Sequence, residues 1–306
     1  MSLPAPADYP PPSTSELPVS RAPWELSGGR AALLVHDMQR YFARVYRPGS
    51  AALERAVSSI ASLLHAARRH GVPVVYTAQS GDQDPAERGL QADLWGPGLR
   101  ADPTDTEILA PLAPRPGELV LAKHRYSAFA RTDLARWLAD QGRDQLVITG
   151  VYAQYGVLAT ALDAFCRDIA PFVVADAVAA FDRPGHLRAL EQAADSCAVV
   201  TTAAAVRAAL ALPRQPPGAP EPGGADEVLR GALAELLDGD EEVEAALAEP
   251  DRDLFALGLD SVRAMALLAA LEERGVAVDF GDFIGAGTVG FLRERIAATP
   301  GAAPPG

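Results

Sequence analysis

Three polar side chains and one aromatic segment stand directly after short apolar runs of the sequence. Asp37, Gln79 and Lys123 each follow such a run, and the segment 152–156 (YAQYG) follows a fourth. A carboxyl group and an ammonium group in one pocket could transfer a proton and bind an anionic substrate. Whether these side chains meet depends on the elements that carry them.

Lys123 is the only lysine among 27 basic residues. Genome composition can replace lysine by arginine wherever only surface charge matters. A retained lysine therefore indicates a position that needs a compact ammonium, which a planar guanidinium does not imitate. Chance retention on the surface is the alternative that this count leaves open.

Alternating apolar and amphipathic segments predict an α/β fold. We expect strands at 31–37, 72–78, 118–122, 145–150, 171–177 and 198–202, and helices at 51–70, 134–141, 157–167 and 186–196. Continuous Val/Ile/Leu strands separated by helices indicate a Rossmann-like parallel sheet covered on both faces. Because ligands bind beyond the carboxyl ends of such strands, the four polar and aromatic positions should share one site.

The length of 306 residues suggests two domains. We assign residues 1–212 to the α/β domain, including a proline-rich N-terminal strap lying on it, and 213–225 to a Pro/Gly linker. Helical patterns at 226–237, 261–274, 282–284 and 289–298 predict a small four-helix domain at 226–298, followed by a disordered tail at 299–306. This second domain holds 17 Asp and Glu residues against 6 Arg, so it is strongly acidic.

Composition excludes several classes of protein. The net charge of −13 leaves no basic stripe for nucleic acid. No apolar run approaches the ~20 residues that span a bilayer, and the N-terminus does not resemble a signal peptide. Two cysteines, Cys166 and Cys197, without metal-ligand spacing fit a reducing cytoplasm, and we expect no metal site.

The segment GLDSVRAM (258–265) lies where a loop meets a helix, and Asp260 could simply cap that helix. In an acidic helical module behind a linker, however, it resembles the phosphopantetheine attachment motif of carrier proteins. The resemblance implies that Ser261 carries covalent 4′-phosphopantetheine, whose thiol holds an acyl group. It also implies an apolar docking surface made by Val262, Met265 and the turn around Phe283, although Val262 and Met265 could equally be core.

Seven segments of the larger domain resemble isochorismatases in order and spacing: VHDMQRYF (35–42), YTAQ (76–79), ERGL (87–90), LWGPGL (94–99), KHRYSAF (123–129), GVYAQYG (150–156) and VADAVAAF (174–181). The likeness covers roughly residues 5–210. The whole chain resembles bifunctional isochorismatase–aryl carrier proteins, which supply aryl-capped siderophores.

The family belongs to a cysteine-hydrolase superfamily with an Asp–Lys–Cys triad. The resemblance implies that Asp37 is the acid, Lys123 the cation and Gly156 the place of the absent cysteine. Without a thiol, a vinyl ether could be hydrolysed by protonation of carbon. That step needs a carboxyl whose pKa is raised by burial, or by negative charge that the substrate supplies against the influence of Lys123.

The resemblance also implies residues that bind a dianionic substrate: Gln79, Arg88, Gln154 and the aromatic walls Phe42, Trp95, Tyr126 and Tyr152. A core role for Phe42 and Trp95 and a surface role for Arg88 stay open. His36 should point to the opposite face of its strand, and His186 should lie on a helix surface. The family often has a cis peptide after Gly150–Val151. Two residues depart from the family pattern, His124 in place of tryptophan and Gln154 in place of histidine.

The leading hypothesis is hydrolysis of isochorismate to pyruvate and 2,3-dihydro-2,3-dihydroxybenzoate. The alternatives are the same reaction on 2-amino-2-deoxyisochorismate, and a catalytically weak docking and delivery protein. The implied partners are a phosphopantetheinyl transferase, an aryl-acid adenylating ligase and the condensation domain of a synthetase. The family also commonly forms dimers or larger homo-oligomers.

Overall fold

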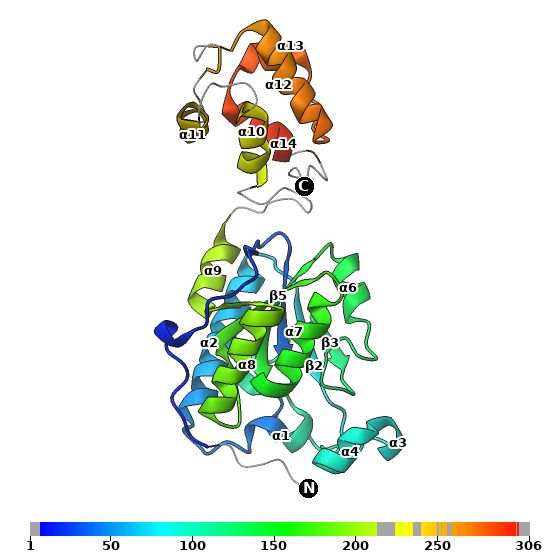
Figure 1. The fold of residues 1–306 in the computed structure, drawn as a ribbon. Helices are drawn as coiled ribbons and strands as arrows, with labels where there is room; N and C mark the ends of the chain where they lie inside the picture. The colour runs from blue at the N-terminus through cyan, green and yellow to red at the C-terminus, as the bar shows by residue number, and fades with distance from the viewer. Residues whose placement is uncertain are drawn as a thin grey trace. The chain divides into compact units, whose positions relative to one another are not determined.

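The six apolar runs of the larger domain form one parallel sheet with the strand order β3-β2-β1-β4-β5-β6. A computed structural model describes residues 7–212, 224–234, 240–249, 251, 253–255, 259–297 and 299. The strands are β1 (Ala31–His36), β2 (Val74–Ala78), β3 (Leu119–Ala122), β4 (Gln145–Val151), β5 (Ala170–Ala179) and β6 (Val199–Thr201). The predicted strands and the parallel sheet are confirmed (Figure 1).

The four predicted helices of this domain are also present. They are α2 (Ala51–Arg69), α6 (Leu134–Asp140), α7 (Leu158–Phe165) and α8 (Arg183–Ser196). The structure adds α9 (Ala203–Ala211), the short helices α1 (Arg40–Ala43), α3 (Pro85–Arg88), α4 (Leu90–Trp95) and α5 (Pro103–Thr106), and single turns η1 (Thr14–Glu16), η2 (Ala110–Leu112) and η3 (Ala153–Val157). Helices of four to six residues contain too few turns to show a helical period in sequence.

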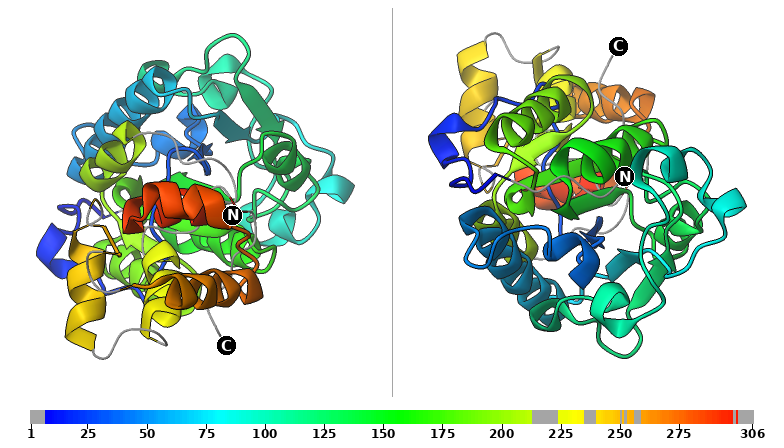
Figure 2. Two further views of the ribbon diagram at one scale, coloured as in Figure 1. Left: turned by 90° about the horizontal axis from the view of Figure 1, so that it is seen from above. Right: turned by 90° about the horizontal axis from the view of Figure 1, so that it is seen from below.

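Alternate residues of the buried strands pack on opposite faces of the sheet. In β1, Leu33 and Val35 join the apolar cluster that includes Ile60 of α2, whereas Leu34 joins the cluster that includes Leu190 of α8. In the view from below, α2 in blue and α7 and α8 in green lie on opposite sides of the sheet (Figure 2). This alternation follows from the two-residue period of a strand.

The described N-terminal residues 7–21, here called the strap, run over the surface of the same domain (Figure 1). The Arg21 amide donates to the Ala194 carbonyl at 3.0 Å, and Ser20 Oγ accepts from the Val200 amide at 2.8 Å. The predicted irregular strap is therefore confirmed for the described residues.

The chain divides into two compact units, Met1–Gln215 and Pro216–Gly306. The second unit contains α10 (Gly224–Ala234), α11 (Asp240–Ala248), α12 (Ser261–Glu273), α13 (Phe280–Ala286) and α14 (Val289–Ala297). Leu229, Leu267, Phe283 and Leu292 meet in its core. Phe283 itself is fully buried, whereas Phe280 and Ile284 in the turn around it are 38% and 46% exposed, so this turn presents apolar side chains other than Phe283 to solvent. The predicted linker and tail lie almost entirely outside the described residues.

Candidate active site

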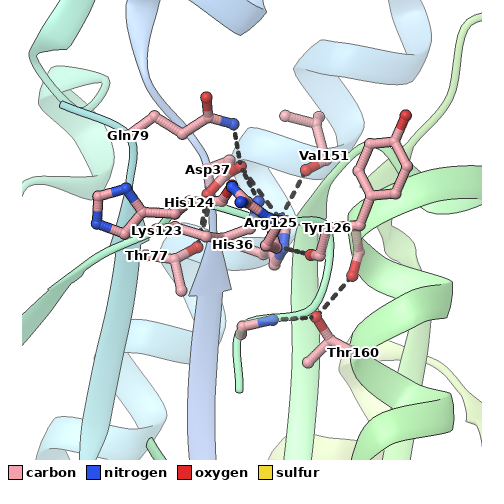
Figure 3. A network of polar contacts seen from close by, with 12 residues as sticks. His36, Asp37, Thr77, Gln79, Lys123, His124, Arg125, Tyr126, Val151 and Thr160 are labelled. Atoms are coloured by element: carbon pink, nitrogen blue, oxygen red, sulfur yellow. Dashed lines mark hydrogen bonds and ion pairs between the residues drawn. The ribbon is translucent and has the colours of Figure 1, made fainter. Parts of the chain in front are cut away.

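Asp37 and Lys123 form a buried ion pair beyond the carboxyl ends of β1 and β3. Lys123 Nζ lies 2.8 Å from Asp37 Oδ2, and the two residues are 1% and 3% exposed. Thr77 Oγ1 donates to Asp37 Oδ1 at 2.6 Å (Figure 3). Asp37 has a φ of +50°, in the left-handed region that side chains other than glycine rarely adopt. Such conformations gather at functional sites, where the surrounding contacts enforce them.

The environment of Asp37 holds its carboxyl group ionised. Burial is the largest influence and raises the pKa, but it is outweighed by the charge of Lys123, by His36 and by hydrogen bonds from Lys123 and Thr77. The pKa of Asp37 is therefore lowered. The first condition stated for a proton donor, a pKa raised by burial, is therefore not met in the substrate-free site. Compensation by the charge of a bound substrate is the condition that stands.

Gln79 and Arg88 bring further donors to the same pocket. Gln79 Nε2 donates to Asp37 Oδ2 at 3.4 Å, and Arg88 Nη1 donates to Gln79 Oε1 at 3.5 Å. Arg88 is only 4% exposed, so the surface alternative is wrong for it. Gly98 lets it lie there, because a Cβ at Gly98 would stand 2.7 Å from the guanidinium. Burial lowers the pKa of Arg88, and its contacts within the described residues are an amide and a carbonyl, without a carboxylate.

Gln39 positions Gln79, a role that sequence reasoning did not find. Its side-chain amide donates to the Gln79 carbonyl at 2.8 Å and accepts from the Gln79 amide at 2.7 Å. It is completely buried. Its place two residues after Asp37 in the first motif was the available signal, as was the place of Thr77 two residues before Gln79.

The predicted aromatic walls all line this pocket: Phe42, Trp95, Tyr126 and Tyr152. Trp95 Nε1 donates to the Tyr126 hydroxyl at 2.6 Å, which ties α4 to the segment after β3. Phe42 belongs to the apolar core as well as to the pocket, so both interpretations hold for it. The Val151–Tyr152 peptide is cis, as expected.

Tyr155 and Phe181 complete the aromatic lining, although they were not predicted as site residues. The Phe181 ring stacks on Tyr152 with a centroid distance of 4.2 Å, and the Tyr155 ring stacks on Tyr126 at 5.6 Å. Tyr155 lies within the motif GVYAQYG, and Phe181 ends the motif VADAVAAF. The pocket therefore presents an aromatic cage above the buried ion pair.

His36 fills the space beside Gly156 in which a cysteine side chain would begin. A Cβ built on Gly156 would stand 2.2 Å from His36 Cε1. The two ring nitrogens of His36 lie 2.8 Å from the Val151 carbonyl oxygen and 3.3 Å from that of Tyr126 (Figure 3). The expectation that His36 faces away from the site is wrong, because the positive φ of Asp37 breaks the strand alternation on which it rested.

Gln154 is the one predicted substrate-binding residue that lies outside this pocket. It lines a neighbouring cavity with Asp182, Gly185 and Arg188, and its buried Oε1 has no hydrogen-bond partner within the described residues. Successive residues of a helical turn point in different directions. Tyr155 therefore reaches the pocket whereas Gln154 does not. His124 also points away from Asp37 (Figure 3).

Within the described ranges, no group of three or more His, Cys, Asp and Glu side chains could hold a metal ion. In those ranges no helix has both the length and the apolar character needed to cross a bilayer. Cys166 is exposed and Cys197 is buried, and both lie outside the pocket lining. Thus neither cysteine supplies the thiol that Gly156 lacks.

Ser261 is exposed at the first position of α12 in the second unit. Asp260 caps this helix, and its Oδ1 accepts from the amides of Val262 and Arg263 at 3.0 and 2.8 Å. Val262 and Met265 are 77% and 63% exposed, which favours docking surface over core. An accessible hydroxyl at a helix N-terminus, beside exposed apolar side chains, fits a phosphate-linked arm that partners must reach.

Comparison with known proteins finds a matching family for each of the two units. Residues 31–205 match the isochorismatase domain, and 227–296 match the phosphopantetheine attachment site. An isochorismatase of Bacillus subtilis is 40% identical over 286 residues, covering 92% of this chain and 90% of that protein. Enterobactin synthase component B of Escherichia coli is 39% identical over 280 residues, covering 92% and 93% respectively.

A phenazine biosynthesis protein of Pseudomonas fluorescens is 47% identical over 200 residues, covering 65% of this chain and 96% of that protein. Among solved structures, a cysteine hydrolase from Pseudomonas syringae superposes with a TM-score of 0.56 at 28% identity, covering 63% of this chain and 97% of that one. The chain therefore belongs to the isochorismatase family of hydrolases and carries a C-terminal phosphopantetheine carrier domain.

Proposed function

We propose that the first unit hydrolyses the enolpyruvyl ether of isochorismate to pyruvate and 2,3-dihydro-2,3-dihydroxybenzoate. The observation that carries this proposal is the buried Asp37–Lys123 pair in an aromatic pocket where Gly156 and His36 replace a thiol nucleophile. Covalent acyl transfer through a cysteine is therefore not open to this site. Protonation of carbon by a carboxyl group is a mechanism that this site can use.

The chemistry assigns one role to each polar group. Asp37 gives its proton to the terminal vinyl carbon, and the ether oxygen stabilises the resulting cation as an oxocarbenium ion. Water adds to that ion, gives a proton back to the Asp37 carboxylate and forms a hemiketal. The hemiketal hydroxyl proton then passes to the ring oxygen as the C–O bond breaks, which yields pyruvate and the ring alcohol. Lys123 and Arg88 bind the carboxylates, and Gln79 orients Asp37.

Substrate binding raises the pKa of Asp37, so that this carboxylate takes up from solvent the proton that it lacks in the free site. A carboxylate brought near Lys123 competes for the ammonium charge that lowers the Asp37 pKa. Burial then dominates, and Asp37 takes up a proton as the dianion binds. Net proton uptake on binding is the direct consequence of this mechanism.

Pyruvate release from isochorismate by the full-length protein tests the proposal. We expect Asp37→Asn, which keeps the shape but cannot donate a proton to carbon, to lose activity by at least about 10²-fold, the lower range for general acid catalysis. If wild type is no faster than this variant, the enzymatic role is refuted. The protein would then be a docking and delivery protein.

A second substrate is favoured by one specific comparison. The phenazine biosynthesis protein is 47% identical over 200 residues and covers 65% of this chain, so a relative named for another pathway also matches at this level. The same steps would convert 2-amino-2-deoxyisochorismate to pyruvate and trans-2,3-dihydro-3-hydroxyanthranilate. Comparing kcat/KM for the two substrates decides between them, since this ratio measures discrimination.

We further propose that Ser261 carries 4′-phosphopantetheine, which would hold the derived aryl acid as a thioester. A phosphopantetheinyl transferase would install the arm, an adenylating ligase would load it and a condensation domain would unload it. The acidic surface of the second unit suits basic patches on such partners. Intact mass should rise by one phosphopantetheinyl group after transferase treatment, and Ser261→Ala should abolish this gain.

A further inference from the structure

Phe181 forms a wall of the active-site pocket, and the strap makes hydrogen bonds to the backbone of the segment that carries it. The residue follows β5, is 7% exposed and stacks on Tyr152. Its position therefore depends on how the backbone of Ala180 and Phe181 is fixed. The strap supplies two of these attachments.

The hydroxyl of Tyr9 in the strap holds the backbone of Ala180 through the amide of that residue. This hydroxyl accepts from the Ala180 amide at 2.8 Å and lies 3.3 Å from the Ala180 carbonyl oxygen. At the next residue of the segment, the Phe181 carbonyl accepts from the Ala7 amide at 2.8 Å. The Tyr46 hydroxyl donates to the Ala180 carbonyl at 3.0 Å.

His186 determines where the single hydroxyl proton of Tyr9 goes. Its Nε2 lies 3.1 Å from the Ala175 carbonyl oxygen, which can only accept, so this nitrogen carries the hydrogen. Burial lowers the pKa of His186 to about 4, so the ring is neutral at pH 7. Its Nδ1 therefore accepts from the Tyr9 hydroxyl at 3.1 Å. His186 is completely buried, which corrects its predicted place on a helix surface.

We propose that Tyr9 is a positioning residue, which holds the Phe181 wall against the substrate ring. The chain of hydrogen bonds runs from the Ala180 amide through the Tyr9 hydroxyl and the His186 ring to the Ala175 carbonyl, and each of its three bonds has one defined donor and one defined acceptor. The inference rests on the proposed hydrolysis of an enolpyruvyl ether. It assigns the strap a part in binding that substrate, in addition to covering the domain.

Tyr9→Phe tests the proposal, because it removes the hydroxyl and keeps the ring. We expect KM for the preferred enolpyruvyl substrate to rise about 3- to 10-fold while kcat stays within about twofold, since the lost contact positions a binding wall. A merely structural role would reduce the active fraction, lowering apparent kcat and leaving KM unchanged. That result would overturn the inference.

A double-mutant cycle identifies Phe181 as the residue through which Tyr9 acts. In a Phe181→Leu background, Tyr9→Phe should change KM by less than about twofold, because coupled residues are not additive. Full additivity would overturn the proposal. Ala7→Pro, which removes the other strap donor to this segment, is the second variant should Tyr9→Phe not fold, and it should also raise KM.

Glu16→Ala is the matched control. Glu16 lies elsewhere on the strap and forms an ion pair with Arg183 of α8. This variant should leave KM unchanged, and an equal rise in KM would mean that general loosening of the strap is responsible. Hydrogen exchange at the Ala180 amide should accelerate in Tyr9→Phe and not in Glu16→Ala. Failure of the proposed function is distinguishable from failure of this inference. If the hydrolysis itself were wrong, the wild-type protein would release no pyruvate.

Discussion

Lys123→Met should destabilise the first unit in a manner that depends on pH. Asp37 and Lys123 are almost completely buried and 2.8 Å apart, so methionine leaves a buried carboxylate without its counter-charge. Breaking such a pair by removing one partner costs about 3–5 kcal/mol. Desolvation would then be the main remaining influence and would raise the Asp37 pKa.

The sign of the pH dependence follows from the two directions of shift. In wild type the folded-state pKa of Asp37 is lowered, so its contribution to stability is present above the unfolded value of ~3.9 and is lost as pH falls below it. In Lys123→Met the folded pKa is raised. The variant therefore loses stability as pH rises from ~3.9 through that raised pKa. The deficit relative to wild type should grow from pH 4 toward neutrality.

Urea unfolding followed by tryptophan fluorescence measures this deficit. Trp24, Trp95 and Trp137 are the three tryptophans of the chain, and all belong to the first unit. The double variant Asp37→Asn/Lys123→Met removes both charges and should recover most of the lost stability, without the pH dependence. A deficit below about 1 kcal/mol that does not change with pH would be the size of a surface pair and would refute the buried-pair argument.

Three further outcomes follow from the site. Because kcat/KM reports the free enzyme, in which the Asp37 pKa is lowered, it should fall about tenfold per unit as pH rises from 6 to 8, and a flat profile would contradict substrate-assisted protonation. Arg88→Met should raise KM about 10- to 100-fold, as expected for a hydrogen bond to a charged group, without lowering the thermal midpoint; an unchanged KM would remove Arg88 from the binding site. Gly156→Cys should destabilise the first unit by about 1–3 kcal/mol, since the new Cβ meets the His36 ring, and His36→Ala should relieve this loss. Recovery of stability in that double variant is measured by the same fluorescence titration, and its absence would place the strain elsewhere.

Local patterns in the sequence were sufficient for much of this protein. Apolar runs of strand length determined the parallel sheet, and the parallel sheet determined that Asp37, Gln79 and Lys123 converge at one edge. Ser261 could be located because a capping aspartate, a helix start and an acidic module are all local features. Side chains that directly follow strands are positioned by the strands themselves, so their meeting needs no further information.

Tertiary structure decided what depends on backbone reversals and on contacts between distant segments. The positive φ of Asp37 interrupts the strand alternation, so that His36 and Asp37 line the same pocket, and the turn at η3 directs Gln154 out of it. A period of two or 3.6 residues encodes neither feature. The Asp37 pKa depends on an ammonium 86 positions away, and the competition between burial and that charge has no local signature. The hydrogen bond between Tyr9 and Ala180 likewise joins residues 171 positions apart, and no local pattern indicates it. Sequence determines which elements form, whereas packing determines which side chains share one dielectric environment and therefore what chemistry they perform.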